Sequence, residues 1–463
     1  MKKALLIPAL LVVLSLTSCQ GQQEPSSSGT PISSKSEEST EPYSFSEDPI
    51  VLKDDEVLVK LGSNFNNQRP DYKLVFHFGD DVFPSSATTY SKDLSYLSFG
   101  SSACNGNRNE LHEFYTRIGY DNFYACPAYN IEPAKDTMGY FFAHRTINGS
   151  EMISVSLRGF DYGAEWANNF LMGATGNHQG FNEKADEVLT GLKAYINDFY
   201  SESNIKLWIT GYSRGGAVAN MLAAKIMEDE TLNIPAESAY VYTFEAPQGL
   251  TQANAKPYQN IFNIVDACDI VPKVAPQAFG LYRCGTDINV YPSNFEEVLK
   301  AFDRGIEIPK FGRKTGYYDT EDQFADYILG KVLEPEEPDT VSLHTRELFV
   351  NNYQDTILFM FDFILSLDNS TRNDLMESLS KNAAKLAGNE NNLYNKVVKP
   401  VLDEHHIQYE EEPLKTHCRI IQVLAIKKLN IITQIMGDNG NRMLMHHYPE
   451  INYALLKHYN ENL

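Results

Sequence analysis

The residues whose types and spacing could do chemistry centre on Gly211-Tyr-Ser-Arg-Gly215, where one serine stands between glycines. The apolar stretch at 205–209 predicts a strand, and the pattern at 217–227 predicts a helix. At a sharp strand-to-helix turn, small flanking residues let a serine hydroxyl project above the sheet. The pattern predicts that Ser213 is a nucleophile. The alternative is a glycine-rich turn in which the serine is inert.

A serine hydroxyl becomes a strong nucleophile when an imidazole takes its proton and a carboxylate orients that imidazole. Asp269 follows a predicted strand at 260–265, and Asp266 is a rival nearer the strand end. His447 precedes Tyr448-Pro-Glu450, where proline and glutamate suit the first turn of a helix, and His446 is its neighbour. The other histidines after Asp269 are His344, His405, His406, His417 and His458. We expect Ser213, Asp269 and His447 to form a catalytic triad.

Arg214 follows the serine where a helix should begin. A cation at a helix N-terminus opposes the helix dipole and costs about 0.3–1 kcal/mol unless it is paired. We therefore expect an acid such as Glu165 or Glu245 to accept the Arg214 side chain.

Metal and cofactor chemistry receives little support from the residue spacing. His405 and His406 stand beside Glu404, but no third ligand follows at a recognisable distance along the chain. We expect neither a metal ion nor a cofactor.

The elements that must position these residues alternate between strands and helices. Strands are predicted at 137–146 and 152–157 around Asn148-Gly149, a strong hairpin signal, and at 239–244. A helix is predicted at 185–200 from apolar residues at three- and four-residue spacing. This order predicts an α/β fold with a mostly parallel sheet, helices on both faces and an antiparallel hairpin at one end.

Beyond about residue 291 the chain becomes rich in helices and charged loops. Helices are predicted at 355–367, 370–387 and 415–436. We expect a cap-like helical insertion over about 291–440. The apolar residues 357–361 and 363–365 either form an acyl-binding or interfacial surface, or simply the core of the helical subdomain.

The N-terminal residues 1–19 have the layout of a secretory signal, with Lys2 and Lys3, an apolar run and a final Leu16-Thr-Ser-Cys19. This ending resembles the bacterial lipobox, in which the cysteine receives lipid; the alternative is a plain signal peptide with a chance cysteine. Residues 20–55 are rich in Ser, Pro and Glu and are predicted to be a disordered tether. We expect a catalytic domain over 56–463, anchored outside the cell membrane through Cys19.

The net charge bears on the class of partner, and the cysteine count bears on disulfide pairing. The chain carries 39 basic and 61 acidic residues, a net charge of −22, so we expect no nucleic-acid partner, because the phosphate backbone would be repelled. Five cysteines follow Cys19, and an odd number leaves at least one thiol outside any internal disulfide. They are Cys104, Cys126, Cys268, Cys284 and Cys418.

Several segments in order resemble the class 3 lipases, and more closely a bacterial branch of lipase-family lipoproteins with Gly-Tyr-Ser-Arg-Gly at the turn. They are Ser156-Leu-Arg-Gly-Phe-Asp-Tyr-Gly-Ala-Glu-Trp166, His178-Gln-Gly-Phe181, Val241-Tyr-Thr-Phe-Glu-Ala-Pro247, Asp269-Ile-Val-Pro272 and His447-Tyr-Pro-Glu450. The resemblance implies an α/β-hydrolase fold and hydrolysis of acyl esters or lipids through an acyl-enzyme. It also implies an oxyanion hole made by the backbone N–H groups of Arg214 and Phe160.

This sequence departs from the family at two of these positions. Phe160 stands where the family often has Ser or Thr, so only a backbone donor remains, and Glu245 replaces a usual small residue. Two other readings stay open. One is a non-catalytic surface lipoprotein that keeps the fold to bind lipid or protein; the other is a serine peptidase or acyltransferase with the same triad.

Overall fold

The computed structural model describes residues 50–62, 71–130, 137–160, 163–200, 204–269, 271–273, 280–306, 346–347, 350–382, 385–386, 389–424 and 445–463. The predicted signal peptide with Cys19, and the predicted tether up to residue 49, lie outside these residues. The first strand begins at Glu56, directly after the predicted end of the tether.

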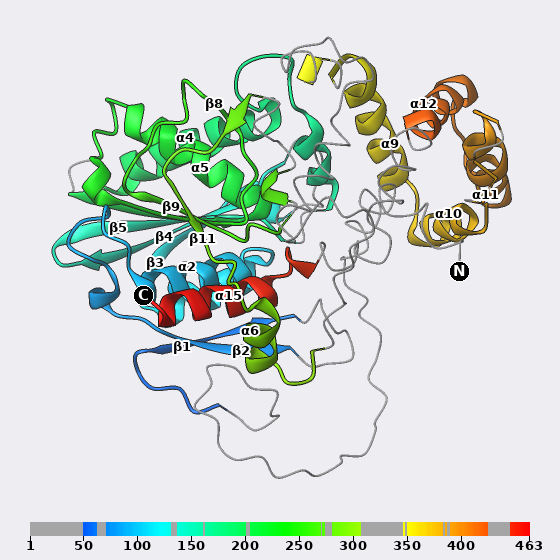
Figure 1. The fold of residues 1–463 in the computed structure, drawn as a ribbon. Helices are drawn as coiled ribbons and strands as arrows, with labels where there is room; N and C mark the ends of the chain where they lie inside the picture. Colours follow the sequence, from blue (N-terminus) through cyan, green and yellow to red (C-terminus); the bar gives the residue numbers. More distant parts are fainter. Residues whose placement is uncertain are drawn as a thin grey trace.

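A seven-stranded sheet forms the centre of the protein, in the order β11-β9-β7-β6-β5-β4-β3 (Figure 1). Its strands are β3 (Asp121–Ala125), β4 (Tyr140–Ile147), β5 (Ser150–Leu157), β6 (Ile205–Tyr212), β7 (Ala239–Phe244), β9 (Ile261–Val265) and β11 (Thr286–Asn289). From β5 to β11 all neighbours are parallel, whereas β4 pairs antiparallel with β5, in a hairpin, and with β3. The predicted mostly parallel sheet with an antiparallel hairpin at one end is confirmed. Asn148 and Gly149 form the turn of that hairpin, at φ 51° and 74°.

Helices cover both faces of this sheet (Figure 1). On one face lie α4 (Gln179–Phe199) and α5 (Ser213–Glu228), and on the other α2 (Lys92–Cys104) and α15 (Pro449–Glu461). In β6 the side chain of Trp208 packs into the core under α2, while Leu207 and Ile209 pack into the core under α4 and α5. Because a strand alternates its side chains, a continuous apolar run is what a strand covered on both faces requires.

Two helices begin earlier than periodicity indicated. The predicted helix at 185–200 starts at Gln179, because His178 Nδ1 caps it by accepting the N–H of Phe181 at 3.4 Å. The predicted helix at 217–227 starts at Ser213, directly where β6 ends. Apolar spacing marks the buried face of a helix and carries little information about its first turn.

Smaller elements surround the sheet. Two short antiparallel pairs join β1 (Glu56–Leu61) to β2 (Tyr72–His77) and β8 (Leu250–Thr251) to β10 (Leu281–Tyr282). Short 3₁₀ or π helices are η1 (Asp80–Val82), η2 (Pro127–Tyr129), η3 (Gly163–Phe170), η4 (Ala236–Ser238), η5 (Val271–Lys273), η7 (Val350–Gln354) and η9 (Tyr394–Val398). Among the described residues, the main body also contains the helices α3 (Arg108–Arg117) and α6 (Phe295–Phe302).

The helix α6 corrects the expected start of the insertion near residue 291. Its buried residues Phe295, Leu299 and Phe302 belong to the same core as α2 and α15, so α6 is part of the main body. An amphipathic helix has the same sequence pattern whether it packs on the core of the main body or on the core of the helical insertion. Only the tertiary contacts decide between these two cores.

Four later helices form a unit with a core of its own (Figure 1). They are α9 (Asp355–Ser366), α10 (Asn369–Asn382), α11 (Lys399–Glu404) and α12 (Glu411–Leu424). The α9 side chains Ile357, Met360, Phe361 and Ile364 are buried in this core. This packing favours the interpretation of the apolar α9 residues as subdomain core. The helix predicted at 370–387 ends at Asn382, and most of the predicted continuation of α12 to residue 436 lies outside the described residues.

Two further features of the described residues concern membrane-spanning helices and disulfides. None of the helices in the described part of the chain is long and apolar enough to cross a membrane. No disulfide links the five cysteines after Cys19, which are all described and buried.

Candidate active site

The turn from β6 into α5 presents Ser213 in a strained conformation. Its φ of 52° is uncommon for a residue with a side chain and costs on the order of 1–3 kcal/mol, a strain that concentrates at functional sites. The neighbouring glycine is required for space, because a Cβ on Gly211 would lie 2.4 Å from the carbonyl carbon of Gly215. The strand, the tight turn and the helix together form the geometry of a nucleophile elbow.

The three residues predicted as a triad lie in hydrogen-bond contact. Nε2 of His447 is 3.0 Å from Oγ of Ser213, and Nδ1 of His447 is 2.6 Å from Oδ2 of Asp269. Asp269 is fully buried, whereas the side chain of His447 is 17% exposed. This arrangement can pass a proton from the serine hydroxyl to the imidazole while the carboxylate holds the opposite ring nitrogen.

The two rivals named from the sequence pair with each other. Nδ1 of His446 lies 2.5 Å from Oδ2 of Asp266, and both side chains are buried. The His446 ring stacks on Phe295 of α6 at a centroid distance of 4.6 Å, on the side of the main-body core. The loop before α15 therefore places two imidazoles opposite two aspartates of the loop after β9, and His447 is the one that reaches Ser213.

The loop before α15 is also held by polar contacts to β6. Asn452 Nδ2 donates to the hydroxyl of Tyr212 at 2.8 Å and to the carbonyl of His446 at 2.8 Å. The Tyr212 hydroxyl donates in turn to the carbonyl of His447 at 3.1 Å. The backbone of the imidazole pair is thus tied to the strand that carries the nucleophile.

A third carboxyl, that of Glu245, is buried beside the two aspartates. Its oxygens accept the backbone N–H of Asp266 at 3.0 and 3.1 Å. Burial, followed by the charges of Asp269 and Asp266, raises the pKa of Glu245 well above its ordinary value of 4.5. The sequence marked this residue as a departure from a small one and as a candidate partner of Arg214, but not as a neighbour of the two aspartates. The third acid could have been suspected from its place at the end of a parallel strand, where ligand sites occur.

Arg214 finds its partner in Glu165, as one of the two predicted alternatives. Nη1 of Arg214 lies 2.9 Å from Oε2 of Glu165, and the other oxygen of this carboxylate pairs with Arg158. Glu165 is fully buried, and both arginines are nearly so. The hydroxyl of Thr137 also donates to Glu165 at 2.7 Å. A single carboxylate therefore connects the helix after the nucleophile with the loop at 158–160.

That loop, which carries Phe160, lies directly against the elbow. A Cβ on Gly159 would sit 1.9 Å from the carbonyl oxygen of Tyr212, so only glycine permits this approach. The Phe160 ring stacks on Tyr212 at a centroid distance of 4.7 Å. Asn105 braces the loop by donating to the carbonyl of Leu157 at 2.5 Å and accepting the N–H of Gly159 at 3.0 Å.

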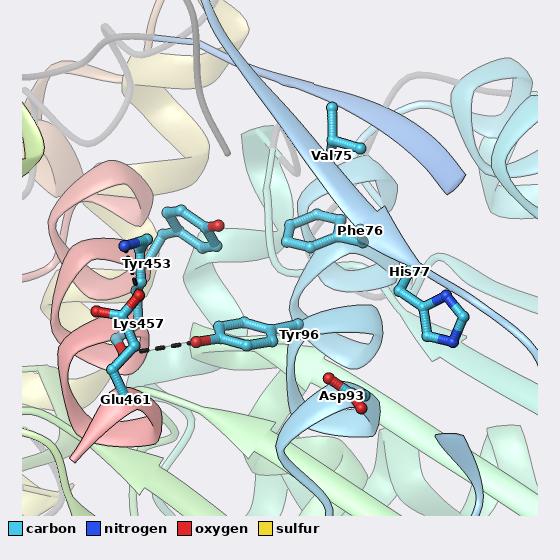
Figure 2. Close-up of a pocket in the computed structure, with 8 residues that line it drawn as sticks. All are labelled: Val75, Phe76, His77, Asp93, Tyr96, Tyr453, Lys457 and Glu461. Atoms are coloured by element: carbon cyan, nitrogen blue, oxygen red, sulfur yellow. Dashed lines mark hydrogen bonds and ion pairs between the residues drawn. The ribbon is translucent and has the colours of Figure 1, made fainter. Parts of the chain in front are cut away.

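A cavity of about 230 Å³ lies away from these residues, between β2, α2 and α15 (Figure 2). Figure 2 shows Tyr96 directed toward the α15 backbone, where its hydroxyl donates to the carbonyl of Lys457 at 3.4 Å. The lining residues are Val75, Phe76, His77, Asp93, Tyr96, Tyr453, Lys457 and Glu461. None of the predicted triad residues lines it, so this cavity is not where Ser213 would act.

The predicted histidine pair at 405–406 has a local partner. Nε2 of His405 lies 2.7 Å from Oδ2 of Asp374 on α10. Within the described ranges, no group of three or more His, Cys, Asp or Glu side chains is arranged to hold a metal ion.

Comparison with known proteins gives a partial family match that spans part of this site. Residues 145–279 match the lipase (class 3) family. The matched region contains Ser213, Asp269 and the loop at 158–160, whereas His447 lies beyond it. The strand order, the elbow and the sequence of serine, aspartate and histidine give the chain an α/β-hydrolase fold.

Similar proteins cover only part of the chain. "Secreted mono- and diacylglycerol lipase 1" of Fusarium solani is 30% identical over 171 residues, which are 33% of this chain and 47% of that protein. "Lipase" of Rhizomucor miehei is 29% identical over 129 residues, 26% of this chain and 34% of its own length. The chain thus spans less than half of the length of these relatives.

Solved structures of fungal lipases also resemble part of the chain. A Rhizomucor miehei triacylglyceride lipase aligns at 21% identity and a TM-score of 0.34, covering 43% of this chain and 79% of that one. A lipase from Rhizopus microsporus var. chinensis aligns at 17% identity and a TM-score of 0.32, covering 45% and 79%. At such TM-scores the fold assignment rests on the topology described above.

Proposed function

We propose that the chain is a class 3 lipase that acts as a serine carboxylester hydrolase on acyl esters of lipids. The observation that carries the proposal is the contact of His447 with both Ser213, at 3.0 Å, and Asp269, at 2.6 Å. The partial match to the lipase (class 3) family and to fungal acylglycerol lipases supports it.

In the proposed reaction, Ser213 attacks the carbonyl carbon of the ester while Nε2 of His447 takes the hydroxyl proton. Asp269 keeps the Nδ1 proton of His447 in place and stabilises the imidazolium that forms. His447 then gives its proton to the departing alcohol, leaving an acyl group on Ser213. Water, activated by the same imidazole, hydrolyses this acyl-enzyme and restores the serine.

The developing oxyanion would be bound by the backbone N–H groups of Arg214 and Phe160. The close approach of Gly159 to Tyr212 supports this assignment, because it brings the loop at 158–160 against the first turn of α5. Two preorganised donors are worth several kcal/mol in such sites, since they act on charge that appears only in the transition state. Glu165 joins the loop at 158–160 to the first turn of α5 through Arg158 and Arg214, and it would hold the two N–H groups in a fixed relative position.

We further propose that the protein works outside the cell membrane as a bacterial lipoprotein, attached by lipid on Cys19. A net charge of −22 would disfavour adsorption to anionic headgroups, so a covalent anchor would supply the proximity to lipid. The helical unit of α9 to α12 would act as a cap. Its contact with η3, which follows the loop at 158–160, supports this placement through Phe361 and Phe170, whose ring centroids lie 5.4 Å apart.

A fluorophosphonate probe tests the enzymatic function directly. We expect the wild type to be labelled, the Ser213→Ala variant to remain unlabelled, and Ser366→Ala, which alters an exposed serine of α9, to be labelled normally. His447→Ala should lower kcat by about 10⁴–10⁶-fold. His446→Asn should cost far less, because His446 contacts Asp266 rather than Ser213.

Some outcomes would reject the function or the assignment of the base. An unlabelled wild type favours the non-catalytic lipoprotein. Full labelling of Ser213→Ala would assign the nucleophile elsewhere. A larger loss of kcat in His446→Asn than in His447→Ala would assign the role of the base to His446 instead of His447. Product analysis with lipid, peptide and alcohol acceptors separates hydrolysis of esters from peptidase and acyltransferase activity.

A further inference from the structure

Glu245 occupies an unusual place for a glutamate. It follows the last residue of β7, its side chain is fully buried, and its backbone has a φ of 47°. This left-handed conformation is unfavourable for residues other than glycine and is retained where the surrounding structure enforces it. The N–H of Glu245 donates to the carbonyl of Ile264 on β9 at 2.9 Å, which directs the residue toward the loop that carries both aspartates.

Three carboxyl groups thus share one buried region with two imidazoles. Asp266 accepts from Nδ1 of His446 and Asp269 from Nδ1 of His447, so each aspartate faces an imidazole. The Glu245 side chain faces this pair of aspartates: its oxygens accept the backbone N–H of Asp266 at 3.0 and 3.1 Å, and burial, followed by the charges of Asp269 and Asp266, raises its pKa. Like charges at such short range in a buried site disfavour a third ionised carboxyl.

We propose that Glu245 is a positioning residue that stays protonated and donates its O–H to Asp269, fixing the carboxylate that orients His447. The inference rests on the proposed hydrolase function. Asp269 already accepts the N–H of Val271 at 2.8 Å on Oδ1 and His447 on Oδ2. A third donor restricts the remaining rotation of this carboxylate, and hydrogen bonds to an ionised acceptor are stronger than neutral ones.

The neutral state of Glu245 matters for the pH dependence of the reaction. If the Glu245 proton is lost to the solvent at alkaline pH, a second anion faces Asp269 and the donor disappears. Asp269 is then repelled from its place, and kcat falls. The charged or titratable groups around this region are Asp266, Asp269, His446 and His447, Tyr212 at the end of β6, Glu450 in α15, and Arg283, which donates to the carbonyl of Ala246 at 2.8 Å.

Two substitutions separate a positioning role from a structural one. Glu245→Gln keeps the shape, an amide N–H that can donate to Asp269, and an oxygen that can accept from Asp266, but it cannot ionise. Glu245→Gly suits the φ of 47° and so relieves backbone strain, while removing the donor to Asp269. A loss in the glycine variant therefore cannot come from a less favourable backbone.

We expect Glu245→Gln to retain kcat within about threefold and to lose any alkaline decrease of kcat that the wild type shows. We expect Glu245→Gly to lower kcat by about 10–100-fold with little change in KM, as for loss of a hydrogen bond to a charged group. Infrared difference spectra of the full chain, wild type minus Glu245→Gln at neutral pH, should contain the carbonyl stretch of a protonated carboxyl.

Three results would overturn the proposal: full kcat in Glu245→Gly, the same alkaline limb in Glu245→Gln as in the wild type, or no protonated-carboxyl band. The infrared measurement needs no turnover, so it decides the protonation of Glu245 even in a variant that is inactive. A wild type that hydrolyses no ester contradicts the proposed function instead, and the two failures are thereby distinguished.

Discussion

A single substitution of Glu165 should test whether its buried ion pairs with Arg214 and Arg158 hold the site together. The Glu165 carboxylate is fully buried between Arg214, at 2.9 Å, and Arg158, and the two arginine side chains are 1% and 4% exposed. We predict that Glu165→Gln destabilises the protein strongly, because it preserves the shape of the side chain while leaving two guanidinium groups without their shared anion.

The magnitude follows from the burial. Removing one partner of a buried ion pair typically costs about 3–5 kcal/mol, because the remaining charge stays in a medium that solvates it poorly. Here the amide retains one acceptor oxygen for the Thr137 hydroxyl or for one arginine, so the lower half of that range, about 3–4 kcal/mol, is expected. Since Glu165 joins α5 to the loop at 158–160, kcat should also fall while KM changes little.

Urea unfolding of the protein provides the measurement, with Glu228→Gln as the matched control. Glu228 pairs with Lys256 at 2.5 Å, but these side chains are 48% and 51% exposed, so its loss should cost no more than about 1 kcal/mol. If Glu165→Gln costs no more than this exposed control, the reasoning about the buried pair is refuted. Adding Arg214→Met to Glu165→Gln should recover part of the loss, because one uncompensated charge is then removed.

Two further predictions concern acid stability and membrane attachment. Burial lowers the pKa of His178 to about 3, so the neutral imidazole contributes fully to the free energy of unfolding above pH 6.5, the ordinary pKa of histidine. This contribution is lost as the pH falls below 6.5, at about 1.4 kcal/mol per pH unit. His178→Asn, which keeps an N-cap acceptor, should therefore lose less unfolding free energy between about pH 6.5 and 5 than the wild type; equal slopes would contradict this. Cys19→Ala should move the protein from the membrane to the soluble fraction, and unchanged fractionation would argue against a lipid anchor there.

Local patterns in the sequence were sufficient for β4, β5, β6, β7 and β9 and for the sharp turn at Ser213, whereas the edge strands β3 and β11 were not predicted. The hairpin at Asn148-Gly149 and the apolar core of β6 are encoded by neighbouring residues, because strand and turn preferences act over a few positions. Gly211 and Ser213 identify the elbow for the same reason. The boundaries were less accurate: α5 begins at Ser213 rather than at 217, since the turn itself is the start of the helix.

The order of acid and base along the chain also pointed to Asp269 and His447, but it could not exclude Asp266 and His446. These residues are separated by 178 and 180 positions along the chain, and which aspartate meets which imidazole depends on how the loop before α15 approaches the loop after β9. A shift by one residue would exchange the partners without altering any local preference.

The sequence by itself therefore determined the residue types, their order and the elements that carry them, because these depend on short-range spacing. Only the tertiary structure decided the partners: Glu165 rather than Glu245 for Arg214, two separate imidazole–aspartate pairs, and a third carboxyl beside them. It also decided that α6 packs with α15 in the main body. Burial and distance between remote segments arise from the packing of the whole chain, and they set both the charge state of Glu245 and the reach of His447.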